Sequence, residues 1–67
     1  MYKIIIKGKN ISRTYDKIFK IIDKHSTFFR VNTENEYRTE EGYVLEFESI
    51  PPEAILEINE LKNVEEL

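Results

Sequence analysis

The residue types that perform nucleophilic or acid–base catalysis are scarce in this chain of 67 residues. It has one histidine, His25, and no cysteine, which excludes a thiolate nucleophile and thiolate metal ligands. His25 and Ser26 are adjacent in the sequence, and adjacent side chains on a helix point in different directions. A serine–histidine pair is therefore not expected, and we predict that the chain is not an enzyme and takes no cofactor.

The carboxylates do not match a metal site either. The chain has thirteen acidic residues but no histidine pair and no spacing typical of an EF-hand loop. Four glutamates could at most gather a weakly held divalent cation; these are Glu34, Glu36, Glu40 and Glu41. We expect them to form a solvated acidic loop, and we predict no metal site.

One short segment has the composition of an anion site. It consists of Lys7, Gly8, Lys9 and Asn10, and it precedes a predicted helix. A glycine turn at the positive end of a helix presents backbone N–H groups to a phosphate, and the two lysines add charge. The chain contains neither a GxGxxG motif nor a P-loop. The segment therefore predicts an anion site without a nucleotide-binding motif.

The charges divide between the two halves of the chain. Residues 1–33 carry eight basic residues and two acids, whereas residues 34–67 carry two basic residues and eleven glutamates. The net charge of −3 thus hides a basic first half and an acidic second half. Such asymmetry is typical of proteins that meet a charged partner or a second copy of themselves. The two halves could also neutralise each other within the fold.

The elements that must position these charges follow from the hydrophobic pattern. Residues 2–7 alternate apolar and polar side chains, which predicts a half-buried strand. Residues 11–25 predict an amphipathic helix whose apolar face consists of Ile11, Tyr15, Ile18 and Ile22. At 100° per residue, the basic residues of this helix lie within about 60° of one another on the other face. They form the basic stripe, defined as Arg13, Lys17, Lys20 and Lys24.

The second half of the chain predicts a hairpin followed by a helix. Residues 27–39 favour a strand with a turn or bulge at 32–35. Glu40-Glu41-Gly42 predicts a three-residue loop with a bulge before a strand over 43–49, because glycine supplies the positive φ that this loop needs. Pro51 and Pro52 begin a helix, since proline is tolerated in the first helical turn. Its apolar face consists of Ile55, Ile58 and Leu61, and its opposite face is the acidic stripe, defined as Glu53, Glu57 and Glu60.

The predicted order is β-α-β-β-α with a short or missing fourth strand at residues 63–67, in a single α+β domain spanning residues 1–67. Two helices on one face of an antiparallel sheet make the ferredoxin-like, split βαβ arrangement. A three-stranded βαββα domain with a C-terminal tail is the alternative. Residues 42–47, the Pro51-Pro52 helix start and residues 61–64 resemble small ferredoxin-like modules such as ACT-type regulatory domains. The resemblance implies the fold alone, because this fold serves many functions.

No apolar run approaches the roughly 18 residues of a membrane span, and the first residues lack the pattern of a signal peptide. We therefore expect a cytoplasmic protein that does not bind membranes. The predicted function is a small protein-binding or regulatory module that acts through the basic and acidic stripes. It would either self-associate into an oligomer or act as an acidic inhibitor of a nucleic-acid-binding protein, as small phage and mobile-element proteins do.

Nucleic-acid binding through the basic face of the first helix is the alternative function. The sheet itself is not expected to stack bases, because the aromatic residues Tyr2, Tyr43 and Phe47 are predicted to face the helices. Charged residues on the open face of the sheet would instead pair across the strands. An incomplete fourth strand would leave one sheet edge free to pair with another chain.

Overall fold

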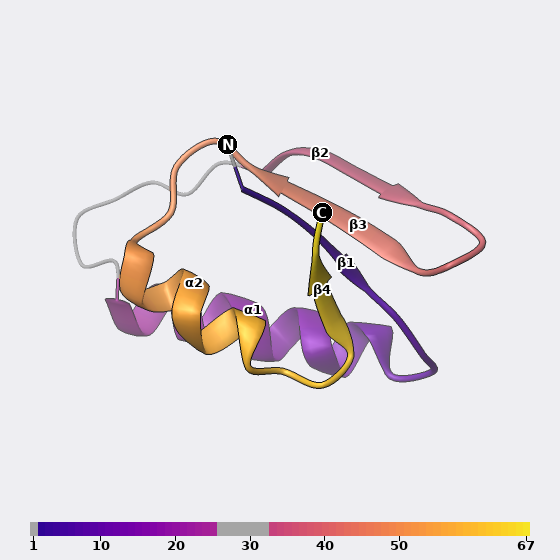
Figure 1. Ribbon diagram of the computed structural model, residues 1–67, viewed down its shortest axis with the longest axis horizontal. Helices are drawn as coiled ribbons and strands as arrows, with labels where there is room; N and C mark the ends of the chain where they lie inside the picture. Colours follow the sequence, from indigo (N-terminus) through magenta and orange to yellow (C-terminus); the bar gives the residue numbers. More distant parts are fainter. Residues whose placement is uncertain (1, 26–32) are drawn as a thin grey trace.

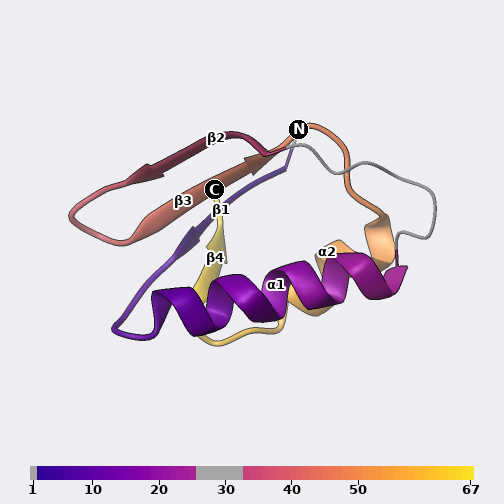
Figure 2. The same cartoon turned by 180° about the vertical axis from the view of Figure 1, so that it is seen from behind.

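The computed structural model describes residues 2–25 and 33–67. Its elements are β1 (Tyr2–Ile6), α1 (Ile11–His25), β2 (Thr33–Arg38), β3 (Tyr43–Phe47), α2 (Pro52–Asn59) and β4 (Val64–Glu66). The strands form one antiparallel sheet, and both helices lie against the same face of it (Figure 1, Figure 2). The predicted α+β class is therefore confirmed, and the helix expected over residues 11–25 has those bounds.

The strand order is β2-β3-β1-β4. Since β1 and β2 both run antiparallel to β3, the strands joined by α1 run in the same direction, with β3 between them. By the same argument, α2 joins β3 to β4 with β1 between them. Residues 64–66 pair with β1, so the three-stranded alternative with a C-terminal tail is wrong.

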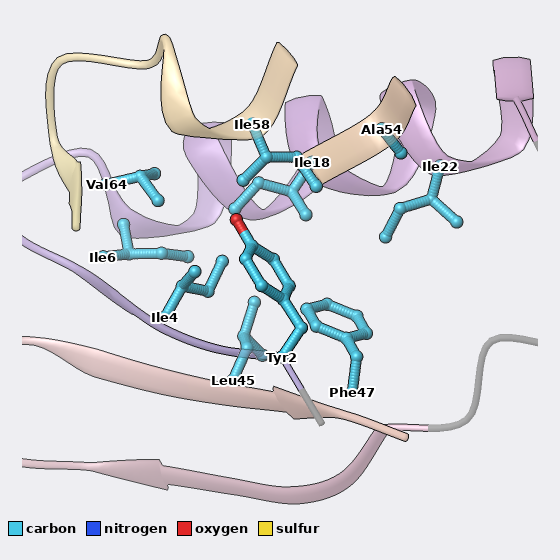
Figure 3. Close-up of a cluster of buried hydrophobic side chains, with 10 residues drawn as sticks. All are labelled: Tyr2, Ile4, Ile6, Ile18, Ile22, Leu45, Phe47, Ala54, Ile58 and Val64. Carbon is cyan, nitrogen blue, oxygen red and sulfur yellow. The ribbon is translucent and has the colours of Figure 1, made fainter. Parts of the chain in front are cut away.

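The core lies between the sheet and the two helices (Figure 3). The central strands contribute Ile4, Ile6, Leu45 and Phe47, all of them fully buried. Ile18 and Ile22 of α1 and Ile58 of α2 meet them from the helical layer. Every second residue of both central strands thus faces the helices, as the alternation predicts. The prediction of a half-buried strand over residues 2–7 is wrong in part, because Ile5 and its neighbour Val44, on the opposite face of the sheet, are buried as well. These contacts fix how α1 is rotated and so which of its residues face solvent.

The apolar face of α2 differs in part from its prediction. Ala54 and Ile58 are buried, whereas Ile55 and Leu61 are only half-buried. The helix begins at Pro52, as the proline pair predicts, and the N–H groups of Ala54 and Ile55 donate to the carbonyl oxygen of Pro51. The buried position in the first turn of α2 is thus occupied by Ala54, whose small side chain does not stand out in a hydrophobic pattern.

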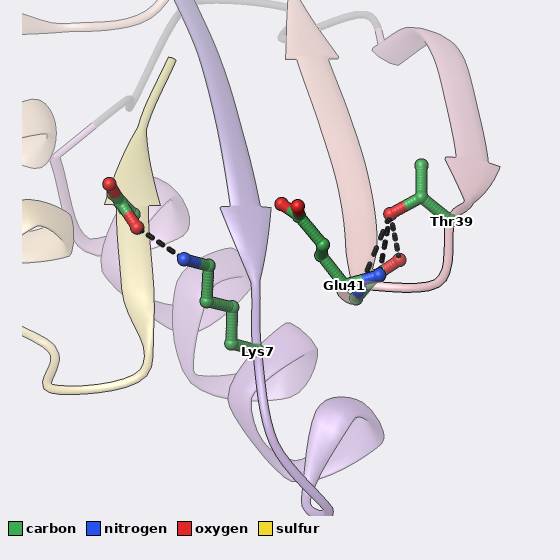
Figure 4. Close-up of polar contacts among 5 residues, drawn as sticks. Lys7, Thr39 and Glu41 are labelled. Carbon is green, nitrogen blue, oxygen red and sulfur yellow. Dashed lines mark hydrogen bonds and ion pairs between the residues drawn. The ribbon is translucent and has the colours of Figure 1, made fainter.

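The hairpin between β2 and β3 occupies the predicted position. The Thr39 N–H donates to the Gly42 carbonyl at 2.7 Å, and the Thr39 hydroxyl accepts from the N–H groups of Glu41 and Gly42 (Figure 4). A Cβ on Gly42 would lie 2.1 Å from the Ile6 carbonyl oxygen, so this close approach requires glycine. The predicted bulge at Gly42 is wrong, because β2 and β3 keep one register from Asn35↔Glu46 to Arg38↔Tyr43, next to the turn that Thr39 and Gly42 close. The register irregularity lies between Thr33 and Asn35, within the predicted turn or bulge at 32–35. Residues 27–32 of the predicted strand lie outside the described residues.

Candidate functional site

The basic stripe lies on the solvent face of α1. Its four residues, Arg13, Lys17, Lys20 and Lys24, are all exposed. The opposite face buries Thr14, Ile18 and Ile22, while Ile11 and Tyr15 are half-buried against the core. A helix packed on a sheet along one face must present the other face to water, so the stripe is a consequence of the same rotation that builds the core.

A hollow of about 320 Å³ lies at the start of α1 and is called the cationic hollow below. Three segments line it: the loop between β1 and α1, the first two turns of α1, and the turn before β4. Its lining residues are Lys7, Gly8, Lys9, Asn10, Arg13, Thr14, Lys17, Lys62 and Asn63. It contains the whole predicted anion segment, it adds two residues of the basic stripe, and no acidic residue lines it.

Asn63 holds two walls of the cationic hollow together. Its side-chain amide donates to the Thr14 hydroxyl at 2.6 Å and to the Lys7 carbonyl at 3.3 Å. The Lys7 N–H donates in turn to the Asn63 carbonyl at 2.7 Å. Thr14 is buried, so the contact is shielded from competing water. Gly8 lies in this loop with φ 94°, a conformation that favours glycine.

Among the described residues, Lys7 is the one cation of this hollow that has a carboxylate partner. Its ammonium group lies 2.6 Å from the Glu65 carboxylate on β4 (Figure 4). This hydrogen bond raises the pKa of Lys7 and lowers the pKa of Glu65. Within residues 2–25 and 33–67, no ion pair joins the other four cations to a carboxylate. These four are Lys9, Arg13, Lys17 and Lys62.

Two further hollows adjoin the cationic hollow around the first turns of α1. One shares Arg13 and Lys17 with it and extends to Lys20, and the other shares Gly8 and Lys9 and extends to Arg38. The basic residues lining the three hollows form the basic end, defined as Lys7, Lys9, Arg13, Lys17, Lys20, Arg38 and Lys62. These are seven of the ten basic residues in the chain, and only two acids, Asp16 and Glu36, line the same hollows.

Sequence reasoning placed Lys7, Lys9, Arg13, Lys17 and Lys20 in candidate sites but missed Lys62 and Arg38. Lys62 follows α2 in the sequence and reaches the start of α1 because β4 pairs with β1. The signal for it was the fourth strand: once β4 lies beside β1, the turn before β4 must lie beside the end of β1. Arg38 ends β2 next to Tyr43, and only the strand pairing places it near Lys9.

Glu36 is engaged by two tyrosines at the edge of the basic end. Its carboxylate accepts from the Tyr15 hydroxyl at 2.9 Å and from the Tyr43 hydroxyl at 2.8 Å. Burial, followed by the hydrogen bond to Glu36, raises the pKa of Tyr15 to about 12. The carboxylate thus links α1 to β2 and β3 through hydrogen bonds to two hydroxyl groups. Tyr15 and Tyr43 also meet edge to face, with ring centroids 6.2 Å apart.

The predicted acidic loop is not a gathered cluster. Glu36 bonds to the tyrosines on the sheet, whereas Glu40 and Glu41 lie in the hairpin turn. The side chain of Glu34 lies outside the described residues. In the described part of the chain, no group of three or more histidine, aspartate or glutamate side chains is placed to hold a metal ion.

One of the three residues of the acidic stripe forms contacts within the molecule. Glu57 accepts from the Lys24 ammonium at 2.9 Å and also contacts the His25 ring nitrogen. These hydrogen bonds, from His25 first and Lys24 second, lower the pKa of Glu57. Glu57 was predicted to lie on the helix face opposite the apolar one, and its carboxylate contacts the last two residues of α1. Glu53 and Glu60, the other members of the stripe, are exposed.

The open face of the sheet carries a mixed surface. Lys3 and Glu46 are opposite each other in the register, but the Lys3 ammonium lies 5.8 Å from the centroid of the Tyr37 ring, and Glu46 accepts from Asn35 at 2.8 Å. Tyr2 and Phe47 lie in the core, and Tyr43 packs against it from the same side, as predicted. The central strands therefore offer no aromatic ring on the open face for a base to stack on.

Comparison of the chain with models of protein families, with curated proteins and with solved structures found no match. Among the residues that the structure describes, neither helix is long and apolar enough to cross a membrane.

Proposed function

We propose that this chain is a non-catalytic binding module that recognises an acidic surface of a protein partner, and that the basic end is its binding surface. The observation that carries the proposal is the gathering of seven of ten basic residues around three adjoining hollows lined by only two acids. One of those acids, Glu36, is already bonded to two tyrosines. Complementary charge of this kind steers encounter and selects the partner.

The whole-molecule charge favours a protein over a nucleic acid as the partner. The isoelectric point is about 5.1, whereas domains that bind nucleic acid are typically strongly basic. A long polyanion would be attracted by the basic end, but it would also approach the eleven glutamates of the second half, which would repel it. An acidic patch on a protein has limited extent, so it can engage the basic end without approaching the remaining acids.

Association through both stripes, or inhibition of a nucleic-acid-binding protein by the acidic half, has less support. Glu57 contacts α1 of its own chain, and Glu36 is bonded to tyrosines. Neither carboxylate is left to form a continuous acidic face with the hairpin glutamates. Within residues 2–25 and 33–67, Lys7 is the one member of the basic end that pairs with a carboxylate, that of Glu65.

We also propose that the fold belongs to the ferredoxin-like, split βαβ class. Its support is that each helix joins two strands running in the same direction with one further strand between them, which is what a split βαβ unit requires. This arrangement brings the β1–α1 loop and the turn before β4 to one end of the molecule. The basic end is a product of that connectivity.

Nucleic-acid binding is the second candidate, and a specific observation favours it. Lys9, Arg13, Lys17 and Lys62 have no carboxylate partner among the described residues, so they are free to contact phosphates. Contacts of that kind are independent of base sequence and weaken steeply with salt. The open sheet face offers no stacking rings on its central strands, so such binding through the basic end would rest mainly on contacts to the backbone.

A single charge reversal tests the proposal against a matched control. We expect Lys20→Glu to weaken capture of the partner from nuclease-treated host lysate about tenfold at about 0.15 M salt, because like charges would then meet at the contact. Lys3→Glu makes the same change of charge on the open sheet face and should leave capture unchanged. About 1 M salt should release the partner from the unaltered chain, since exposed charges are then screened.

Three other results would contradict the proposal. If Lys3→Glu weakened capture of the partner as much as Lys20→Glu, capture would depend on the net charge of the chain and not on the basic end. Capture that disappears on nuclease treatment would favour the nucleic-acid candidate. Recovery of a second copy of this chain, lost with Glu53→Lys as well as with Lys20→Glu, would favour self-association through the two stripes.

A further inference from the structure

We infer that the cationic hollow binds a phosphoryl group, so that the partner presents a phosphorylated side chain to the start of α1. The inference rests on the proposed function, because it names the chemistry of the partner group that the basic end receives. It depends on four cations that converge from three segments of the chain: Lys9, Arg13, Lys17 and Lys62.

The number of unpaired cations favours a phosphoryl group over a carboxylate. A carboxylate carries one charge and two oxygens, which one or two cations can satisfy. A phosphorylated side chain carries a charge between about −1.5 and −2 and three acceptor oxygens. Four cations that have no carboxylate partner among the described residues match the larger anion. Arg13 adds a planar guanidinium that can donate two parallel hydrogen bonds to phosphate oxygens.

The cationic hollow also differs from the other hollows of the molecule. Each of four other hollows in the described part of the chain has at least one carboxylate in its lining. In the two that adjoin it, Asp16 or Glu36 lies among the cations. A carboxylate would repel a phosphoryl group, so the cationic hollow is the position where such a group meets cations alone.

The frame of the hollow is fixed before any ligand arrives. Asn63 bonds to Thr14 of α1 and to the Lys7 carbonyl, so the turn before β4 is held to both the helix and the loop. Lys62 is adjacent to Asn63 and lines the same hollow, so one of the four cations is carried by this held turn. A preformed frame lowers the entropy lost on binding and therefore favours selective recognition over loose counterion contact.

The test compares phosphate with other anions on the full chain. Backbone amide resonances are followed by ¹H–¹⁵N spectroscopy during titration with inorganic phosphate, and separately with acetate at the same ionic strength. We expect phosphate to shift residues 8–14 and 62–63 selectively and acetate to shift them little. A phosphoserine peptide should bind at least about tenfold more tightly than the same peptide with glutamate, because the phosphoryl group carries more negative charge and a third acceptor oxygen.

Two substitutions with the same change of charge locate the site. Lys62→Gln removes a cation that lines the cationic hollow but lies off the basic stripe, and it should weaken phosphate binding about tenfold. Lys20→Gln removes a cation of the stripe that does not line this hollow, and it should change phosphate binding less than about twofold. Both side chains are exposed, so an unchanged dispersion of amide resonances should show that both variants stay folded.

The outcomes separate this inference from the proposed function. Equal shifts with acetate and phosphate, or equal weakening by both substitutions, would overturn the phosphoryl site. If Lys20→Glu still abolishes capture in that case, the charge-directed binding module stands without it. Selective phosphate binding together with unchanged capture in Lys20→Glu would keep the phosphate site, but it would overturn the proposal that the basic end binds the partner and, with it, the assignment of that phosphoryl group to the partner.

Discussion

The two helices carry stripes of opposite charge that look equivalent in the sequence and are not equivalent in the molecule. The basic stripe of α1 is exposed along its length, and three of its residues, Arg13, Lys17 and Lys20, have no ion pair within the described residues. The acidic stripe of α2 is divided, because Glu57 is bonded to Lys24 and His25 of α1 while Glu53 and Glu60 remain in water. Periodicity shows which side chains share a helix face, but it does not show whether a neighbouring element meets that face.

The difference follows from the lengths of the helices and from where they meet. The longer helix, α1, has 15 residues and α2 has 8. Glu57 contacts the last two residues of α1, so the meeting point is the carboxyl end of the longer helix. The amino end of α1 is bordered instead by the loop after β1 and the turn before β4, both of which add lysines. One end of α1 is thus partly neutralised, and the other collects further positive charge.

The largest expected effects are on the free energy of unfolding, and they test whether both helices are packed equally firmly against the core. Ile18 of α1 and Ile58 of α2 are fully buried, so Ile18→Ala and Ile58→Ala should each lower the free energy of unfolding by about 2–5 kcal/mol. Leu56→Ala, at a side chain that is 69% exposed, should change it by less than about 0.5 kcal/mol. Urea unfolding followed by circular dichroism measures all three. A cost below about 1 kcal/mol for Ile58→Ala alone would show α2 to be loosely held, and the contact of Glu57 with α1 would lose its basis.

Most of the fold could be predicted because it follows from local patterns. Alternation in residues 2–7 and 43–47 predicts which side chains face the helices, since the period of a strand is two. The period of α1 predicts Ile18 and Ile22 as core residues in the same way. Ala54 was missed because a small residue carries little weight in a hydrophobic pattern. The strand β4 stayed uncertain because three residues are too few to show a period, and its pairing with β1 decides it.

The candidate site could be predicted only in part because it is assembled across the chain. The segment 7–10 and the start of the basic stripe are close in sequence, so their proximity follows from the predicted strand, loop and helix. Lys62 lies more than fifty positions from Lys7 and joins it only through the pairing of β4 with β1. The bonds that engage Glu36 and Glu57 also depend on tertiary contacts. A count of the glutamates in the sequence therefore overstates how many carboxylates are available to a partner.

Effects of intermediate size compare the polar contacts that hold each helix to the sheet. The Tyr2 hydroxyl donates to the Asn59 side chain at 2.6 Å, and the Asn59 amide donates to Glu66 at 2.9 Å, which links β1, α2 and β4. Burial, and then Glu66, raises the pKa of Tyr2 to about 12. Tyr2→Phe should lower the free energy of unfolding by about 1 kcal/mol, because a buried hydrogen bond is lost. Tyr37→Phe is the control, since its ring is 43% exposed on the open face.

The sign of the pH effect at Tyr2 can be worked out from its raised pKa. The protonated hydroxyl is favoured in the folded state, so its stabilising contribution is complete below the ordinary tyrosine pKa of about 10 and is lost as the pH rises toward about 12. Tyr2→Phe should therefore be less sensitive to alkali than the unaltered chain, as measured by urea midpoints at pH 8 and above about pH 10. An identical alkaline decline in both proteins would mean that Tyr15, whose pKa is also raised to about 12, dominates and that the α1 contact is the stronger one.

The smallest expected effect bears most directly on the two stripes. The hydrogen bonds from His25 and Lys24 lower the pKa of Glu57, so its stabilising contribution is present above the ordinary glutamate pKa of about 4.3 and is lost as the pH falls through the lowered value. Glu57→Gln should therefore lower the urea midpoint slightly at pH 7, and the difference from the unaltered chain should vanish at acid pH. The effect should be small because exposed ion pairs contribute little to stability.

Glu53→Gln is the control, because it removes the same charge from the same helix at a position with no ion pair within the described residues. Its urea midpoint should show no such dependence on pH. Equal and pH-independent midpoints for both variants would mean that Glu57 is as free as Glu53. The acidic stripe would then be as available as the basic stripe, and pairing of the two stripes between copies of the chain would become the better account of the charge asymmetry.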